Sequence, residues 1–376
     1  MSISASIKEF ALDLGYCDVG IAPAERYTEF IDDVTNRKEL YHFFVARPTK
    51  PVFHADPANV TAQAKSVISV AYNYMTHAFP KHLLQYIGRA YLGRCYMSPP
   101  DRIQGSRFKL LCEHVTSLGC TIQKDIFVPE RWAAARAGVA TFGRNNFAYA
   151  SKGGSFVILS SIVVDKELDY DTHTTEIPCP SDCTICMKAC PSKAIYAPNK
   201  LNPQRCLAFN AWMTREGMPG QTGYIEPEMR ELMGTRVHGC DYCQEACPRN
   251  QTVLKATCPE DPFLELLARD FSLEKMLVMD DTFYHSRVQP IMYNYLKEKK
   301  YFQRNAAIAI GNLRNSEHVP LLENALRNNS QEMVRGYAAW ALGRIGGTRS
   351  KTILEAAVGT ESSPFASSEI NAALNR

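Results

Sequence analysis

Two blocks of cysteines, each closed by a Cys-Pro dipeptide, limit the folds open to this chain more than any other pattern in it. The first block has the spacing C-x3-C-x2-C-x3-C-P, and the second has the spacing C-x2-C-x3-C-P with one more cysteine upstream. In two-cluster ferredoxins, three closely spaced thiolates hold one 4Fe-4S cluster, while the cysteine before the proline ligates the other cluster. The pattern therefore predicts a segment folded around two 4Fe-4S clusters that exchange one ligand. We assign Cys179, Cys183, Cys186 and Cys247 to the first cluster, and Cys190, Cys206, Cys240 and Cys243 to the second.

Two zinc sites of four cysteines each are the alternative, because structural zinc sites also use pairs of closely spaced cysteines. Such pairs do not require a tight third cysteine or a Cys-Pro in each half, so the iron-sulfur interpretation is preferred. One spacing departs from the bacterial ferredoxin pattern: three residues, not two, separate Cys179 from Cys183. Cys179 is therefore the ligand that fits the pattern least well. Cys258 and the four cysteines of the first third are interpreted as buried apolar residues.

No segment has the pattern of an export signal or a membrane span. Near the N-terminus, Ile7, Phe10 and Leu14 stand at helical spacing with charged residues between them. The longest apolar run, 156–164, is too short to cross a bilayer as a helix. We therefore expect a cytoplasmic protein, in which thirteen reduced cysteines are explained by metal binding or catalysis. The net charge of +3 permits contact with a polyanion but excludes the strongly basic character of a dedicated nucleic-acid binder.

Three regions with different patterns follow one another along the chain. Residues 1–170 have the alternating helix and strand patterns of an α/β or α+β domain. Residues 171–260 contain short helical pieces broken by Cys-Pro and Asn-Pro, as expected of a ferredoxin-like domain held together by metal ligation, and residues 261–376 are helical. In the first region we expect helices over 1–14, 104–118 and 129–137, and strands over 19–22, 66–72, 120–126 and 155–164.

Two similar blocks in the last region indicate helical repeats. FQRNAAIAIGNL begins at Phe302 and VRGYAAWALGRIG begins at Val334, so Gly311 and Gly343 stand about one repeat length apart. Small residues in both blocks allow close packing of helices. We expect a short C-terminal pair of HEAT-like repeats.

The second cysteine block, LMGTRVHGCDYCQEACPRN from Leu232 to Asn250, carries the most specific family resemblance. KSVISVAYNY from Lys65, GRNN from Gly143, Gly154 with Ser155, and AAWALGRIG from Ala338 extend it over nearly the whole chain. On these motifs the chain resembles the epoxyqueuosine reductases, cobalamin-dependent iron-sulfur enzymes of tRNA modification that are distantly related to reductive dehalogenases.

The resemblance implies an oxidoreductase with a nitroreductase-like α/β domain that holds cobalamin. Its reaction would convert epoxyqueuosine to queuosine in the anticodon stem-loop of a tRNA, with electrons passing through the two clusters from an external donor such as flavodoxin or ferredoxin. The cofactor carries the hard chemistry, while the protein supplies orientation and protons. A monomer is expected.

The resemblance also implies that the HEAT-like tail helps to hold the tRNA. Basic side chains along such a tail could face the phosphates, which would make binding depend strongly on salt. A charge-rich helical surface that is merely solvated is the alternative. The basic residues concerned are Lys297, Lys299, Lys300, Arg304, Arg314, Arg327, Arg335, Arg344, Arg349 and Lys351.

The proton donor is the point at which this sequence departs from the family. An ungapped match to the family's acidic-Arg pair, here Glu130 and Arg131, puts Lys124 where the family has its catalytic aspartate, with Asp125 one position later. A shift of one residue turns a strand side chain to the opposite face, so Asp125 can act as general acid only if a local bulge restores its direction. Lys124 and Tyr96 are the alternative proton donors.

The resemblance assigns cofactor contacts to four residues. Arg144 and Asn145 match a Gly-Lys-Asn stretch of the family, although turn chemistry at Gly143 is an alternative explanation for them. Ser155 and Arg131 are the other two.

Two further functions stay open at this point. The family's Gly-Arg-Asp-Tyr-His stretch is GRCYM here, with Cys95 and Met97 in place of the Asp and the His. A paralogous cobalamin and iron-sulfur reductase that acts on another substrate is therefore one alternative. A non-catalytic iron-sulfur electron carrier is the second.

Overall fold

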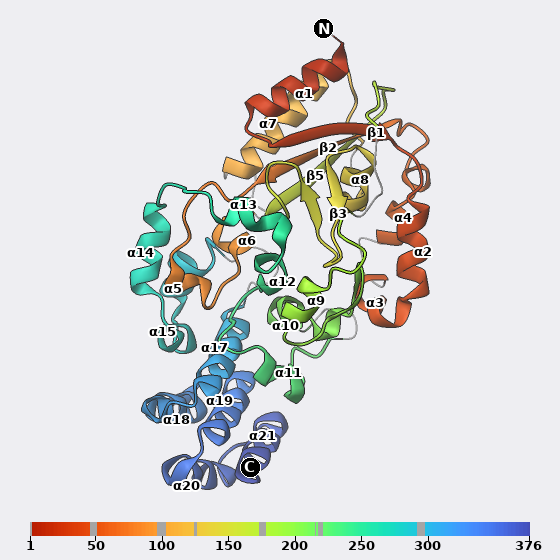
Figure 1. Ribbon diagram of the computed structural model, residues 1–376. Helices are drawn as coiled ribbons and strands as arrows, with labels where there is room; N and C mark the ends of the chain where they lie inside the picture. The colour runs from red at the N-terminus through yellow and green to blue at the C-terminus, as the bar shows by residue number, and fades with distance from the viewer. Residues whose placement is uncertain are drawn as a thin grey trace.

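The structure is a computed structural model that describes residues 2–45, 51–95, 103–123, 126–172, 178–214, 216, 221–291 and 298–376. Figure 1 shows an elongated molecule with a β-sheet near the N-terminus at one end and the C-terminal helices at the other. The cysteine-rich segment lies between them. Within the described ranges, none of the helices has the length and apolar character that a bilayer span needs.

A three-stranded antiparallel sheet forms the centre of the N-terminal region, which is called the sheet domain below. Its strands lie in the order β1 (Asp18–Pro23), β2 (Ser66–Asn73) and β5 (Val157–Val164). β2 is buried over its first seven residues, because both of its faces are covered. Ile68 and Val70 pack in the cluster that contains the inner faces of α1 (Ile3–Asp13) and α7 (Ile103–Ser117). The alternate residues Val67 and Ala71 pack in the clusters that include alanines of α8 (Glu130–Arg136).

The helices expected over 1–14, 104–118 and 129–137 are thus confirmed, as are the strands over 19–22, 66–72 and 155–164. The expected strand over 120–126 is wrong for its described part, where Ile122 makes only an isolated bridge with Val164. The segment runs beside the end of β5 for only a few residues, where the Gln123 N–H donates to the carbonyl of Val163, and this contact is too short to form a strand.

Shorter elements surround the sheet. One side carries α2 (Thr28–Asn36), α3 (Lys38–Val45) and α4 (Pro51–His54), as Figure 1 shows. A small hairpin of β3 (Ala140–Phe142) and β4 (Ala148–Ala150) lies between the sheet and the cysteine-rich segment.

The cysteine-rich segment is built from helices of only four to six residues. Helices this short are unstable on their own, so other contacts must hold them in place. Pro203, Pro227 and Pro248 each begin a helical turn, where a missing N–H costs nothing. The elements are α9 (Ile185–Ala189), β6 (Ile195–Ala197), β7 (Lys200–Leu201), α10 (Leu207–Trp212), α11 (Pro227–Leu232), α12 (Tyr242–Glu245) and α13 (Gln251–Leu254).

The C-terminal region is helical, as expected, and its main helices stack in pairs. A Cβ atom added at Gly311 would lie 2.8 Å from Cζ3 of Trp340, and one added at Gly343 would lie 2.6 Å from Cβ of Ala373. The two glycines therefore allow the close helix packing that the repeated blocks predicted. The elements are α14 (Pro262–Asp270), α15 (Leu273–Leu277), α17 (Lys299–Leu313), α18 (Val319–Asn328), α19 (Glu332–Ile345), α20 (Gly347–Val358) and α21 (Pro364–Leu374).

One hydrophobic core joins these helices to earlier parts of the chain. It includes Leu83 of α5 (Lys81–Leu84), Ile87 just after it and residues of α10 and α11, and it continues to Ala373 in α21. The helical region therefore does not have a core of its own. The predicted boundaries near residues 170 and 260 stay predictions.

Candidate iron-sulfur centre and its contact with the sheet domain

The first predicted set of thiols comes together where the two cysteine blocks meet. Burial raises the pKa of the Cys186 thiol, and the charges of the Cys247, Cys183 and Cys179 thiols raise it further. Such charge effects fall off with distance, so these sulfur atoms lie near one another. The same four cysteines also line one small cavity, together with residues of the sheet domain.

The second set is grouped in the same way. Burial raises the pKa of the Cys243 thiol well above its usual value, and the charges of Cys240, Cys206 and Cys190 raise it further. The backbone N–H of Ala194 donates to the Cys190 sulfur over 3.2 Å. Hydrogen bonds of this kind to ligating sulfurs help to set the potential of an iron-sulfur cluster.

Two groups of four thiols are the donor set that two 4Fe-4S clusters need. Within the part of the chain that the structure describes, no three Cys, His, Asp or Glu side chains are close enough to hold one metal ion together. In a cubane, each thiolate binds a different iron atom, so the four sulfurs stand around the cluster instead of converging on one ion. Cys190 and Cys247 each lie with the thiols of the other block, while the ligation of clusters by these eight cysteines stays a prediction.

A buried hydrogen-bond network joins the second cysteine block to the sheet. The Ser155 backbone N–H donates to Oδ1 of Asn250 over 2.9 Å, and its hydroxyl donates to Oε1 of Gln244 over 2.9 Å. The preceding Gly154 has a φ of +54°, and a Cβ there would lie 2.3 Å from Oδ1 of Asn250. Glycine at this position allows the turn before β5 to touch the cysteine block.

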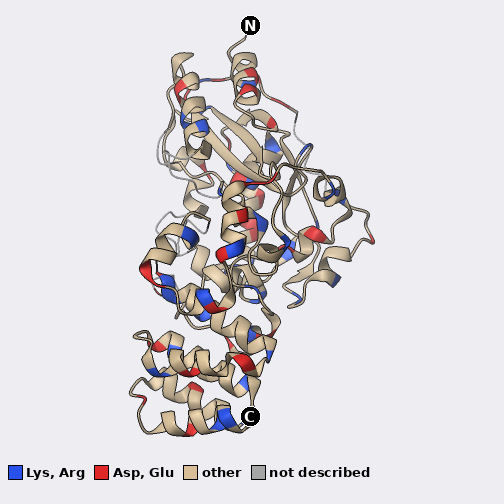
Figure 2. Cartoon of the chain, turned by 90° about the vertical axis from the view of Figure 1, so that its left-hand side faces the viewer, with Lys and Arg blue, Asp and Glu red and all other residues tan. Residues whose placement is uncertain are grey.

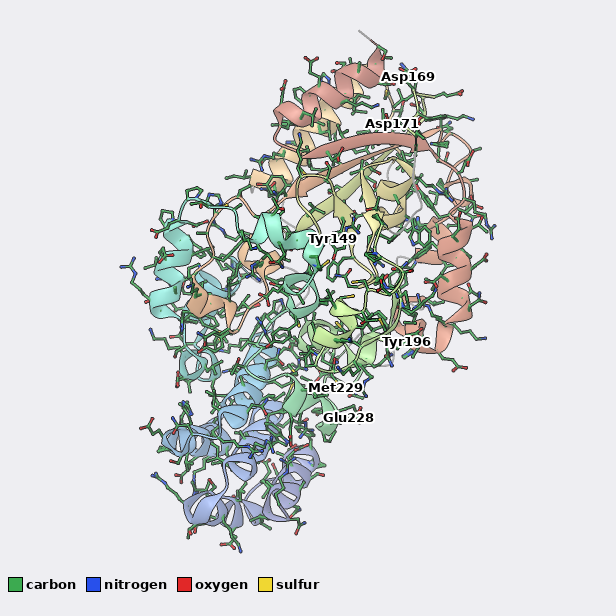
Figure 3. The ribbon with its side chains drawn as sticks, in the orientation of Figure 1. Tyr149, Asp169, Asp171, Tyr196, Glu228 and Met229 are labelled. Carbon is green, nitrogen blue, oxygen red and sulfur yellow. The ribbon has the colours of Figure 1, made fainter. Side chains whose placement is uncertain are left out.

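A second connection runs through the β3–β4 hairpin to thiols of both sets. The Nδ2 of Asn145 donates to the Tyr149 hydroxyl over 2.8 Å and to the carbonyl of Cys243 over 3.3 Å. Burial raises the pKa of Tyr149, and a hydrogen bond to Cys247 raises it further. Figure 3 shows Tyr149 in the middle of the molecule, where the sheet domain meets the cysteine-rich segment.

Arg249 connects the same parts of the chain. Its guanidinium lies 4.0 Å from the centroid of the Tyr149 ring and donates to the Thr141 hydroxyl over 2.7 Å. One of its nitrogens stands 4.0 Å from the Cys179 sulfur.

Next to the second set of thiols lies a buried carboxylate. Oδ2 of Asp241 accepts hydrogen bonds from the backbone N–H of Arg89 over 2.8 Å and from its guanidinium over 3.1 Å. Burial raises the pKa of Asp241, while these bonds and the positive charge of Arg89 lower it.

Of the residues assigned to the cofactor, two already have partners within the protein. Asn145 and Ser155 are each 3% exposed and form the hydrogen bonds that join the sheet domain to the second cysteine block. Arg144 lines the cavity of the first cluster, and its Nε atom is buried without a hydrogen-bond partner among the described residues. Arg131 is exposed at the start of α8 and donates to Oδ1 of Asn146 over 3.0 Å. Arg144 is therefore the one with a buried polar atom free for a ligand.

The three candidate proton donors, Tyr96, Lys124 and Asp125, lie outside the described residues. Cys95, which directly precedes Tyr96, is 4% exposed, and burial raises the pKa of its thiol to about 12. Cys95 therefore acts as a core residue. The interpretation as buried cysteines holds for Cys95 and Cys120, whereas Cys17, Cys112 and Cys258 are only partly buried.

One basic residue of the tail is placed differently from the prediction. Arg304 cannot face a phosphate, because it is fully buried and its guanidinium donates to backbone carbonyls that include those of Thr214 and Ala211. A basic residue within a helical pattern was expected at the surface, but here it satisfies the carbonyls of a neighbouring segment. Six others form ion pairs with carboxylates: Lys299, Lys300, Arg327, Arg335, Arg344 and Lys351.

Figure 2 shows both signs of charge interspersed along the helical end. Arg314 and Arg349 are exposed, and Lys297 lies outside the described residues. The tail therefore has the mixed surface of an ordinary solvated helical domain over its described part.

Sequence reasoning did not assign roles to Tyr149, Arg249 or Asn250. Gln244 and Asn250 stand in the motif that carries the family resemblance, which was the available signal for them. Arg249 stands in the same motif, but Tyr149 had no such signal, because its contact depends on how the β3–β4 hairpin folds against the second block.

Comparison with known proteins agrees with the geometry of the thiols. Residues 179–250 match the model of a 4Fe-4S double cluster binding domain, and residues 291–375 match HEAT repeats. Both assignments made from the sequence for these regions are confirmed.

The whole chain is also similar to proteins of one kind. An epoxyqueuosine reductase of Staphylococcus aureus is 25% identical over 373 residues, which cover 94% of this chain and 92% of that protein. The solved structure of epoxyqueuosine reductase from Bacillus subtilis, with its catalytic loop swung out of the active site, has a TM-score of 0.82 at 24% identity and covers 99% of this chain and 98% of that one. An epoxyqueuosine reductase solved with an epoxyqueuosine-modified tRNA stem loop has a TM-score of 0.81 at 23% identity, covering 99% and 97% of the two chains. The chain thus resembles the epoxyqueuosine reductases over nearly its whole length and has their fold.

Proposed function

We propose that this chain is a cobalamin-dependent reductase of the epoxyqueuosine reductase type, which converts epoxyqueuosine to queuosine in tRNA. The observation that carries the proposal is the position of the first thiol set. Its cavity is lined by Arg144, Asn145 and Tyr149 of the sheet domain, so a cluster held there would adjoin the part of the chain where the cofactor is expected. Electrons reaching this cluster would be delivered to that domain.

The residues around this cavity fit a polar cofactor. A buried guanidinium nitrogen without a partner, such as Nε of Arg144, carries a desolvation cost that a bound acceptor would offset. The peripheral amides of a corrin ring supply such acceptors. Cobalamin, when bound, supplies a reducible cobalt centre that can act as a nucleophile toward an epoxide.

The protein's own task in this reaction is to hold the substrate and supply protons. Loss of the epoxide oxygen as water, with formation of an alkene, consumes two electrons and two protons. An acid near the departing oxygen must supply one of these protons. Asp125, Lys124 and Tyr96 remain the proposed donors, and Arg131 and Arg144 the proposed cofactor contacts.

The tRNA anticodon stem-loop is the proposed partner, with flavodoxin or ferredoxin as electron donor. The chain is proposed to act as a monomer. Since most tail residues that could meet phosphates are paired with acids, we propose that Arg314 and Arg349 are the tail residues available to RNA.

A paralogous reductase with another substrate is the second candidate function. It is favoured by the replacement of the family's Asp and His at Cys95 and Met97. The burial of Cys95 weakens this candidate, because a side chain packed in the core does not contact the substrate and so does not determine its identity.

One experiment separates the candidates. The chain is reconstituted anaerobically with iron and sulfide, mixed with cobalamin, and supplied with dithionite and tRNA that carries epoxyqueuosine. The proposal predicts a base-off cobalt(II) signal by electron paramagnetic resonance and formation of queuosine in the tRNA. Corrin binding without queuosine would favour the paralogue, and an absence of corrin binding would favour an electron carrier.

A further inference from the structure

The surroundings of the two thiol sets differ in charge. Arg249 lies beside the first set, and its hydrogen-bond acceptors are neutral: the Thr141 hydroxyl at 2.7 Å and the Phe142 carbonyl at 3.3 Å. Within the described ranges it takes part in no ion pair with a carboxylate. Its positive charge is therefore not neutralised locally, and one of its nitrogens points at the Cys179 sulfur over 4.0 Å.

Tyr149 adds a second polar side chain on the same side. It lines the small cavity together with Cys179 and Cys247, and its ring lies under the Arg249 guanidinium at 4.0 Å. The stacked pair thus lies beside two of the thiols assigned to the first cluster. Donors and positive charges stabilise the additional negative charge of a reduced cluster, which raises its reduction potential.

Around the second set the charges are balanced. Arg236 stacks on Tyr242, two residues after Cys240. The buried Asp241 carboxylate directly follows Cys240 in the chain. Asp241 in turn shares Arg89 with Glu245, so this group holds two cations and two carboxylates. The second cluster therefore lacks an uncompensated positive neighbour of the kind that Arg249 provides.

The two sets also face different parts of the fold. The cavity of the first set opens onto Arg144 and Asn145 of the sheet domain. In the second set, Cys206 packs beside Phe209 and Met213, and Cys240 packs against the large helical core. A potential that rises from the second cluster to the first would thus direct electrons toward the sheet domain.

We infer that Arg249 and Tyr149 act as positioning residues that raise the potential of the first cluster above that of the second. In the step concerned, one electron leaves the reduced second cluster, which returns to its oxidised 2+ state, and reduces the first cluster from the 2+ to the 1+ state, with no bond made or broken. The inference rests on the two-cluster part of the proposed function and does not depend on cobalamin or tRNA.

The test is an anaerobic redox titration of the full-length, reconstituted protein, poised with dithionite and followed by electron paramagnetic resonance. Arg249→Gln should lower the potential of the first cluster, so that the equilibrium constant for transfer from the second cluster falls about tenfold, or ~59 mV for one electron. The second cluster's step in the titration curve, its wave, should keep its potential. Arg249→Lys should restore most of the shift, and Tyr149→Phe should lower the first wave in the same direction. A Cys206→Ser variant identifies the titration wave of the second cluster, and Arg344→Gln in α19 of the helical tail is the matched control.

Unchanged waves in Arg249→Gln with both clusters present would overturn the inference, as would an equal shift of both waves. If Arg249→Gln loses the first cluster altogether, Tyr149→Phe decides: a lowered first wave supports the inference, and an unmoved one overturns it. A purely structural role would lower iron content without moving a potential. Failure of the two-cluster assignment itself would appear as an absence of any iron-sulfur signal in the unmodified protein.

Discussion

Asn250 and Ser155 hydrogen-bond to each other in both directions: the Ser155 N–H donates to Oδ1 of Asn250 over 2.9 Å, and Nδ2 of Asn250 donates to the Ser155 hydroxyl over 2.8 Å. Ser155 precedes β5 of the sheet, and Asn250 closes the second cysteine block three residues after Cys247. Both residues are buried. One amide side chain thus joins the sheet to the segment that ligates both clusters.

Replacing Asn250 by Ala should destabilise the protein. The change removes these bonds and a third to the carbonyl of Gln244 at 2.8 Å, so buried partners are left unsatisfied. We expect a loss of about 3 kcal/mol, measured from urea unfolding of the anaerobic holoprotein. Asn328→Ala, at an exposed position, is the control and should change stability by no more than about 0.5 kcal/mol. Equal effects of the two variants would contradict the role given to Asn250.

Arg304→Met should affect stability and leave RNA binding unchanged. Its fully buried guanidinium donates to the carbonyls of Thr214 and Asn210, which would lose this donor. We expect a loss of about 3 kcal/mol. The dependence of tRNA affinity on salt, followed by fluorescence anisotropy, should keep its slope. A reduced slope at full stability would show that Arg304 meets phosphate after all. The exposed Arg314→Gln is the matched comparison, and its slope should fall by about one unit if this residue contacts the backbone.

The cysteine pattern predicted both thiol sets because ligand exchange follows from the order of the cysteines along the chain. Hydrophobic periodicity similarly predicted the helices of the tail and the three strands of the sheet. Neither pattern contains the positions of side chains from distant segments. The burial of Arg304 and the stacking of Arg249 on Tyr149 both depend on such contacts, so they could be found only in the folded structure.

Gly343→Ala should also be destabilising, although alanine normally favours a helix. The new methyl group would lie 2.6 Å from Cβ of Ala373, which must move together with α21. Overpacking of this kind costs about 1–3 kcal/mol, and the midpoint of thermal unfolding should fall. Gly359→Ala is the matched control, because a Cβ at Gly359 meets no atom within 4 Å. A neutral Gly343→Ala would mean that the two helices are not packed as closely as described.

The Glu361 carboxylate should make the tail sensitive to acid. Two hydrogen bonds from Arg335, at 2.6 and 2.8 Å, hold the pKa of Glu361 below its usual value of 4.5. A lowered folded-state pKa means that the stabilisation is present above pH 4.5 and is lost as the pH falls through the folded value.

Glu361→Gln should therefore lower the unfolding midpoint at pH 7, and its difference from the unmodified protein should shrink below pH 4.5. Glu355→Gln is the control, since its carboxylate stands 4.0 Å from Lys351 on the exposed surface, where an ion pair contributes little. A Glu361→Gln effect that is the same at both pH values would argue against the ion pair as its cause.

Metal and sulfide analysis of the anaerobically prepared protein tests the two-cluster assignment most directly. Two 4Fe-4S clusters predict about eight iron atoms and about eight acid-labile sulfides per chain, with loss of the first cluster alone in Cys186→Ser. Zinc in place of iron, without acid-labile sulfide, would contradict the assignment and with it the proposed route of electrons to the sheet domain.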